Sequence, residues 1–280
     1  MWRHTFLHPH RLAHAPTRLR LALVAGATLA CTLCASLIAT AQPSPQTPPR
    51  EPLTIAPAEA MQPWTGDLDG MIARETIRVL TVYSKTFYFV NKGIQRGATY
   101  DLLQQFEAAL NARLAKEQKL KHKHLKVRVV FIPVNRDELL PALVAGKGDI
   151  AAANLTVTAQ REKLVDFSSP VYRNVSELVV SGPASPAVSS LDDLAGQDVF
   201  VRTSSSYAES LVALNQRFAA EHRPAVRIKE VPETLEDEDL IEMVNAGLLP
   251  RIIVDNHKAV FWKQIFPTIT VHDRVVTFPA

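Results

Sequence analysis

Hydroxyl groups and an arginine follow an apolar run in the middle of the chain. The sequence NLTVTAQR places Thr156, Thr158 and Arg161 directly after the apolar residues 150–153. Thr158 is a good N-cap for a helix that begins at Ala159, and the free N–H groups of a helix start attract anions. A guanidinium group is a planar fork that pairs with a carboxylate through two hydrogen bonds. These residue types at this spacing predict a seat for an anionic group.

A plainer interpretation of the same stretch needs no ligand. Thr158 would then only cap the helix, and Arg161 would pair with Asp166 at the surface. Taken alone, the stretch slightly favours this structural role, so other parts of the chain have to decide between the two.

Two later segments carry side chains of complementary chemistry. Ser205 and Ser206 lie in the hydroxyl-rich run 202–206, which follows a predicted strand and opens a predicted helix. Asp255 directly follows the apolar residues 252–254, and its carboxylate would either face an ammonium group or cap the next helix. Together with the anion seat, these groups predict a cleft that accepts a zwitterion such as an amino acid.

Strand-like and helical segments alternate along the chain, which predicts an α/β fold with parallel sheets. The alternation restarts after Gly182 and Pro183, so we expect two units that close around the ligand by a hinge motion. Ligands of open α/β sheets bind outside the carboxyl ends of the strands, where the three polar segments fall. The predicted strands cover residues 77–83, 127–133, 150–153, 198–202, 226–231, 251–254 and 269–271, and the predicted helices after the first loop cover residues 101–114, 138–145, 207–219, 235–245 and 257–265.

Residues 1–41 have the pattern of a secretory signal peptide. A basic segment without acids precedes the apolar run 21–38, and residues 39–41 form a small-residue cleavage site. We therefore expect export to the periplasm and cleavage after Ala41. An uncleaved membrane anchor is the alternative, because the apolar run has close to the minimum length of a spanning helix. Residues 42–74 begin with a segment rich in proline and alanine and predict a linker.

The composition excludes several classes of partner. The 280-residue chain has a net charge of +3 and no basic stripe with interleaved aromatics, so no nucleic-acid partner is expected. Cys31 and Cys34 both lie in the signal peptide, and we predict no metal and no cofactor in the mature chain. The basic run 116–128 and the acidic run 233–242 are expected to be solvated surfaces. Tyr83, at the end of the first predicted strand, would supply an apolar wall or belong to the core.

The opening stretch also resembles a motif of family 3 of the bacterial extracellular solute-binding proteins. That family carries Thr/Ser-x-Thr-x-x-Arg, followed by Phe-Ser and a tyrosine, and the chain has this order from Thr156 to Tyr172. The resemblance covers about residues 77–273. It implies an α/β, two-lobed, type II periplasmic-binding-protein fold, with lobe 1 at residues 75–180 and lobe 2 at residues 181–272.

The resemblance also implies a role for each polar segment. In that family the arginine holds the ligand carboxylate with help from the hydroxyls, the second lobe adds hydroxyl donors, and an aspartate holds the ligand's amino group. Together with Tyr83, the residues expected to bind the ligand are therefore Thr156, Thr158, Arg161, Ser205, Ser206 and Asp255.

Three longer segments resemble the N-terminal solute-binding module of the membrane-bound lytic transglycosylase F family. They cover residues 83–103, 133–158 and 235–259. Enzymes of that family couple this module to a C-terminal domain that cleaves peptidoglycan. The resemblance implies that residues 273–280 begin a return segment into lobe 1, that the fold is C-terminally truncated there, and that the chain carries no catalytic residue.

These resemblances imply a periplasmic, monomeric and non-catalytic sensor module. Its partner would be a small carboxylate-bearing ligand such as an amino acid or a muropeptide, with contacts to the cell wall and the membrane left open. Two alternatives remain: a lytic transglycosylase represented without its catalytic domain, and the amino-acid receptor of an ABC transporter.

Replacing Arg161 with alanine is expected to abolish the binding of any carboxylate ligand, because the seat loses its cationic fork. Titration calorimetry of the wild type and of Arg161→Ala with amino acids and muropeptides measures the effect. An unchanged affinity would remove Arg161 from the predicted seat.

Overall fold

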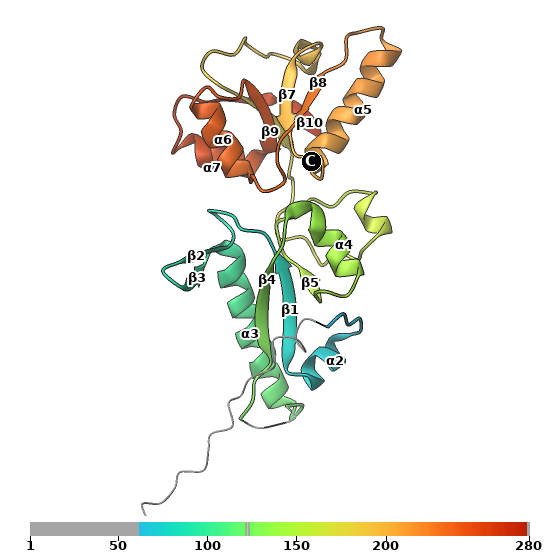
Figure 1. Cartoon of the computed structure of the whole chain (residues 1–280), viewed down its shortest axis with the longest axis vertical. Coiled ribbons are helices and arrows are strands. Elements are labelled where there is room, and N and C mark those ends of the chain that lie inside the picture. The colour runs from blue at the N-terminus through green and yellow to red at the C-terminus, as the bar shows by residue number, and fades with distance from the viewer. Residues whose placement is uncertain (1–61, 121, 123, 279–280) are drawn as a thin grey trace, which may run out of the picture. The chain divides into compact units, whose positions relative to one another are not determined.

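The computed structural model describes residues 62–120, 122 and 124–278, and their strands form two larger sheets and a hairpin (Figure 1). The predicted signal peptide and the first part of the predicted linker lie outside these residues. No helix in the described part of the chain is long and apolar enough to cross a membrane. The first part contains α2 (Leu68–Ala73), β1 (Thr76–Thr81), β2 (Phe89–Asn91), β3 (Ile94–Arg96), α3 (Ala98–Lys116), β4 (Arg128–Pro133), η1 (Arg136–Glu138), α4 (Leu139–Val144), β5 (Ile150–Ala151) and η2 (Arg161–Lys163). The second part contains β6 (Glu177–Ser181), η3 (Leu191–Leu194), β7 (Asp198–Val201), α5 (Ser206–Ala220), β8 (Arg227–Glu230), α6 (Asp237–Asn245), β9 (Arg251–Asp255), α7 (Asn256–Lys263) and β10 (Thr270–Phe278).

The first sheet is parallel and has β1 at its centre, between β4 and β5. Side chains of successive residues point to opposite faces of a strand. Ile77 and Val79 pack on one face with residues of α3, which lies along the sheet in Figure 1. Leu80 and Val82 pack on the other face with Leu139 of α4. Because helices cover both faces, β1 is buried along its whole length.

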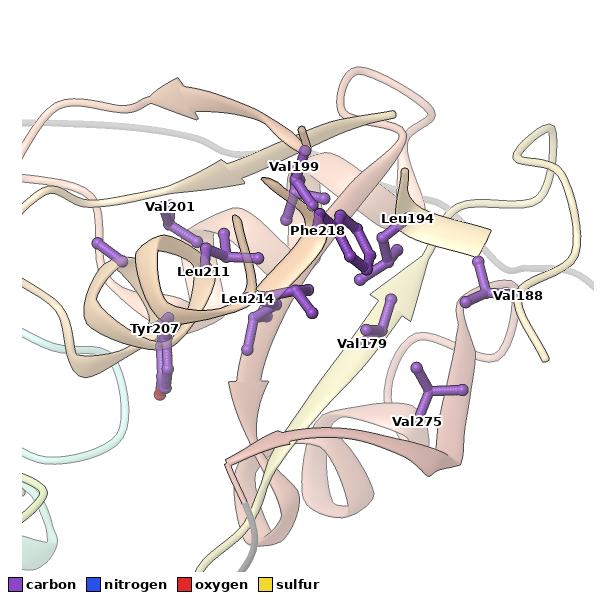
Figure 2. Close-up of a cluster of buried hydrophobic side chains, with 13 residues drawn as sticks. Val179, Val188, Leu194, Val199, Val201, Tyr207, Leu211, Leu214, Phe218 and Val275 are labelled. Carbon is purple, nitrogen blue, oxygen red and sulfur yellow. The ribbon is translucent and has the colours of Figure 1, made fainter. Parts of the chain in front are cut away.

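The second sheet has the strand order β10-β6-β9-β7-β8. The strands β7, β8 and β9 are parallel, as predicted, whereas β6 runs antiparallel to β9 and β10 runs antiparallel to β6. Val199 of this sheet packs against Leu211 and Phe218 of α5 in the cluster that Figure 2 shows. Ile252 packs on the other face with Ile241 of α6. In both sheets, the loops at the carboxyl ends of the parallel strands therefore follow strands that are buried between helices.

The prediction of a helix that begins at Ala159 is wrong. Only the single 3₁₀ turn η2 follows β5, and β5 itself has two residues rather than the four predicted. Leu164, which would continue an apolar helix face, is 60% exposed. A helix without an apolar face to bury gains too little to propagate beyond its costly first turn.

Elsewhere, tertiary packing adds elements that local sequence did not indicate. The end of the expected linker forms α2, because Leu68, Met71 and Ile72 pack against the face of β1 that contains Ile77. A hairpin of β2 and β3 forms around Gly93, between the first predicted strand and the first predicted helix. The last strand continues beyond residue 271, because β10 pairs with β6 from Thr270 to His272 and again, after an irregular stretch, at Val276 and Phe278. The described residues expected to begin a return segment therefore belong to β10.

A buried ion pair fixes the start of β5 to β1. The carboxylate of Asp149 accepts hydrogen bonds from the backbone N–H of Arg78 at 2.7 Å and from its guanidinium at 2.9 Å. Arg78 is 1% exposed and also donates to the carbonyls of Gln62 and Gly146. Burial alone would raise the pKa of Asp149, but the hydrogen bonds from Arg78 and Arg74 outweigh it and lower the pKa. The pair thus connects three separate segments of the first part.

We expect Asp149→Asn to lower the free energy of unfolding by about 3 kcal/mol, because it leaves the guanidinium of Arg78 buried without a counter-charge. The lowered pKa means that the stabilisation is present above the unfolded pKa of an aspartate, about 4, and is lost as the pH falls through the folded pKa. Urea denaturation from pH 7 down to pH 3 measures both effects. The matched control is Asp192→Asn, which removes only exposed ion pairs with Arg217 and Arg223. Equal losses in the two variants would contradict the assignment.

Candidate ligand-binding site

The loops at the carboxyl ends of the parallel strands meet between the two sheets. In the first part these loops follow β1, β4 and β5, and in the second part they follow β7, β8 and β9. Arg136, after β4, forms two hydrogen bonds of 2.8 and 2.5 Å with the carboxylate of Glu236. Ser84, after β1, donates to Glu238 at 2.6 Å. The predicted meeting of polar loops is therefore built largely from residues that the sequence did not single out.

Arg161 directs its donors to backbone carbonyls. It is 8% exposed, and its two terminal nitrogens donate to the carbonyls of Thr156 and Ser204, both at 2.9 Å. The remaining guanidinium nitrogen lies 3.9 Å from the carboxylate of Glu209. Burial lowers the pKa of Arg161. Thr158 accepts a hydrogen bond at 3.3 Å from the backbone N–H of Arg161, the first residue of η2. In this conformation Arg161 connects the two parts of the chain.

The serine run before α5 divides its hydroxyl groups between two tasks. Ser205 is the N-cap of α5, because its oxygen accepts from the N–H of Ala208 at 3.2 Å while its hydroxyl donates to the Arg202 carbonyl at 2.6 Å. Ser204 donates its backbone N–H at 2.9 Å and its hydroxyl at 2.6 Å to the carboxylate of Glu233. Ser206 is buried. The anion-binding donors of this turn therefore hold a carboxylate that belongs to the chain.

Asp255 is bound to an ammonium group of the chain. The Nζ atom of Lys258 lies 2.8 Å from Asp255 and 2.6 Å from Asp237, and the hydroxyl of Tyr207 is 3.3 Å away. Burial alone would lower the pKa of Lys258, but the charges of the two carboxylates outweigh it and raise the pKa. Asp237 also accepts a hydrogen bond of 2.5 Å from Arg202. Asp255 thus faces a cation that belongs to the chain, Lys258.

The acidic run 233–242 is the largest departure from the expected site. We predicted a solvated helix face, and this is wrong for its centre: Glu236, Asp237 and Glu238 are 4%, 2% and 2% exposed. Their partners come from distant segments of sequence, so no local spacing signals them. The only local signal was the acidic run itself. Acidic side chains are favourable at the start of a helix, where they interact with the helix dipole, so the run could have indicated a helix start rather than a solvated helix face.

Two cavities lie beside this acidic loop, and Tyr83 and Thr234 line both. One has a volume of about 350 Å³ and the other about 410 Å³. Tyr83 is 61% exposed, so the apolar wall predicted for it is available at the surface rather than in the core. The six other predicted residues line neither cavity. The first cavity is lined by Val82, Tyr83, Pro133, Val134, Asn135, Arg136, Glu138, Glu233, Thr234 and Glu236, and the second by Tyr83, Ser84, Lys85, Phe89, Thr234 and Asp239.

One parallel and one mixed sheet, each flanked by helices and with loop-lined cavities at the strand ends, define a type II periplasmic-binding-protein fold, as predicted. The chain belongs to the bacterial extracellular solute-binding proteins, family 3, whose model matches residues 77–250. An ancestral arginine-binding protein bound to arginine has a similar structure, with a TM-score of 0.53 and 25% identity over 74% of this chain and 81% of that one. A putative L-cystine ABC transporter protein from Listeria monocytogenes has a TM-score of 0.55 and 21% identity over 70% of this chain and 76% of its own.

Among curated relatives, the chain is similar to a membrane-bound lytic murein transglycosylase F. The protein of this name from Methylobacillus flagellatus is 26% identical over 78% of this chain and 42% of its own length. The chain therefore spans about two-fifths of the relative that it matches.

The two hydrogen bonds between Arg136 and Glu236 connect the first part of the chain to the second, and removing them is expected to weaken this connection. We expect Arg136→Met to lower the free energy of unfolding by about 3 kcal/mol, because Glu236 is left buried without its counter-charge. The control is Lys85→Met. Lys85 also joins the two parts, through Asp239 and Glu242, but it is 53% exposed in its side chain, so we expect a loss below about 1 kcal/mol. Urea denaturation compares the two variants, and equal losses would contradict a special role for the buried pair.

Proposed function

We propose that the chain is a periplasmic solute-binding module that holds a small ligand between its two sheets and catalyses no reaction itself. The observation that carries this proposal is the cavity of about 350 Å³ lined by loops of both sheets. Its volume falls in the range of small-molecule sites, roughly 300–1,000 Å³. Its position, at the carboxyl ends of parallel strands, is where open α/β sheets bind ligands. The signal-peptide pattern of residues 1–41 supports export.

The walls of the cavities suit a ligand with both a flat or apolar part and hydrogen-bonding groups. The ring of Tyr83 lies 5.8 Å from the ring of Tyr88, which stacks on Phe131 at 5.1 Å. The ring of Tyr83 thus packs against Tyr88, and its exposed surface is free to contact a ligand. Asn135 and Thr234 add neutral polar groups. An amino acid side chain or the sugar and peptide parts of a muropeptide would fit these surfaces.

Similarity to the lytic transglycosylases supports a cell-wall fragment as the ligand. In this proposal the module senses muropeptides for a peptidoglycan-cleaving activity that lies outside the segment shared with those relatives. The second candidate is an amino-acid receptor of an ABC transporter. It is favoured by the structural similarity to an arginine-binding protein that was observed with arginine bound.

We expect Tyr83→Ala to weaken ligand binding about tenfold, because truncating an aromatic ring that the bound ligand covers can cost more than 1 kcal/mol. Tyr83→Phe keeps the ring and should retain the affinity. Titration calorimetry of the purified chain with muropeptides and with amino acids measures both variants. Tyr172→Ala is the control: Tyr172 is 49% exposed and stacks on His257, outside both cavities. A muropeptide affinity that Tyr83→Ala leaves unchanged would exclude the proposed wall, and binding of amino acids alone would favour the transporter receptor.

A further inference from the structure

Side chains at the start of α6 bond directly to the loops of the first part of the chain. Glu236 accepts two hydrogen bonds, of 2.8 and 2.5 Å, from Arg136, which follows β4. Glu238 accepts a hydrogen bond of 2.6 Å from the hydroxyl of Ser84, which follows β1. The ammonium group of the next residue, Lys85, lies 2.8 Å from Asp239 and 2.7 Å from Glu242. The chain itself supplies both partners of each of these bonds.

The first part holds its side of this contact in a fixed shape. The hydroxyl oxygen of Ser84 accepts a hydrogen bond of 3.0 Å from the backbone N–H of Phe87. The backbones of Ser84 and Tyr88 exchange two further hydrogen bonds, of 2.8 and 3.3 Å. Arg136 donates to the carbonyl of Ala153 at 3.1 Å. All of these bonds lie within the first part, and groups that are already ordered lose less conformational freedom when two surfaces meet.

The electrostatics of the two cations favour this contact. Burial and the like charge of Arg202 would lower the pKa of Arg136, but the hydrogen bond to Glu236 and its charge outweigh them and raise the pKa. The pKa of Lys85 is also raised, because the hydrogen bonds to Asp239 and Glu242 outweigh the partial loss of water. The contact therefore stabilises the charged form of both side chains.

The contact borders both cavities. Arg136 and Glu236 line the cavity of about 350 Å³, and Ser84, Lys85 and Asp239 line the cavity of about 410 Å³. The bonds between the two parts therefore also hold the walls of both cavities together.

We infer that the bonds from Ser84, Lys85 and Arg136 to the start of α6 form a latch, which keeps the two parts of the chain closed in the absence of a solute. Closure then does not wait for a ligand to bridge the two parts. A solute enters only while the latch is open, so its apparent affinity is reduced by the fraction of molecules that are open. The latch goes beyond the proposed function and does not depend on it, because all of its groups belong to the chain.

The experiment measures the separation of the two parts by double electron–electron resonance. Spin labels are attached at Gln105→Cys in α3 and Gln216→Cys in α5, two exposed positions on different parts of the chain. Cys31 and Cys34 are replaced by serine in every protein measured. Unfolding and refolding in solute-free buffer removes any solute that is carried through purification. The labelled protein with an intact latch should give one narrow distance distribution.

Reversing one charge of the latch should open it. Arg136→Glu places a second carboxylate against Glu236, and because like charges in contact repel, the distribution should shift and broaden. The double variant Arg136→Glu with Glu236→Arg restores opposite charges and should return the narrow distribution. Arg227→Glu is the matched control, because it places a like charge beside Asp198 within the second sheet and should leave the distribution unchanged.

A second variant tests the latch if Arg136→Glu does not fold. Ser84→Ala removes the hydroxyl that donates to Glu238, so the closed arrangement would bury this carboxylate without that donor, and the distribution should again broaden. A broad distribution for the protein with an intact latch would overturn the inference. So would a distribution that stays narrow in the latch variants.

The outcome is separate from that of the proposed function. If calorimetry detects no binding of amino acids or muropeptides, the proposed function fails. The resonance measurement still decides whether the latch closes the chain, because it is made without solute.

Discussion

Three consecutive carboxylates are buried at the start of α6, and each requires a partner. Glu236 is matched by Arg136, Glu238 by the hydroxyl of Ser84, and Asp237 by Lys258 together with Arg202. The helix dipole favours acids at this position, but it does not compensate for the loss of water around three charges. The burial of this acidic turn therefore determines which segments must come together.

The carboxylates of Glu236 and Glu238 have their partners in the first part of the chain, whereas Asp237 has its partners in the second part. Glu236 and Glu238 take their partners from the loops after β4 and β1, so they join the second sheet to the first. Asp237 takes all of its partners from the second part of the chain, where β7, α5 and α7 converge. One turn of helix thus organises both the contact between the two parts and the interior of one of them. The cavities lined by Tyr83 lie beside this contact because the same loops form it.

The polar groups that follow the strands are largely paired within the chain. Arg161, Ser204 and Asp255 are the kinds of groups that bind a zwitterion, and in this chain each has a partner from the chain itself. The cavity of about 350 Å³ is lined instead by Tyr83, by neutral polar residues and by charged residues, namely Arg136, Glu138, Glu233 and Glu236.

The spacing of apolar residues was sufficient to predict those strands and helices that are stabilised by burying their own apolar face. The predictions of β1, α3, β4, α5 and β9 correspond closely to the structure, because their apolar residues recur at strand or helix spacing. It failed after Ala159, where capping residues suggested a helix but no apolar face supported one. It also missed α2 and most of β10, which form by packing on or pairing with strands that are distant in sequence.

By itself, the sequence determined the α/β class, the order of most of the longer strands and helices, and the presence of hydroxyl, guanidinium and carboxylate groups after the strands. These properties depend on residue type and on spacing within a few positions of the chain. Only the tertiary structure decided the partner of each charge. Lys258 is three residues from Asp255 and twenty-one from Asp237, and Arg136 is one hundred residues from Glu236. A charge can be matched by any opposite charge that the fold brings within a few ångströms, so its partner is set by distance in space and not by distance along the chain.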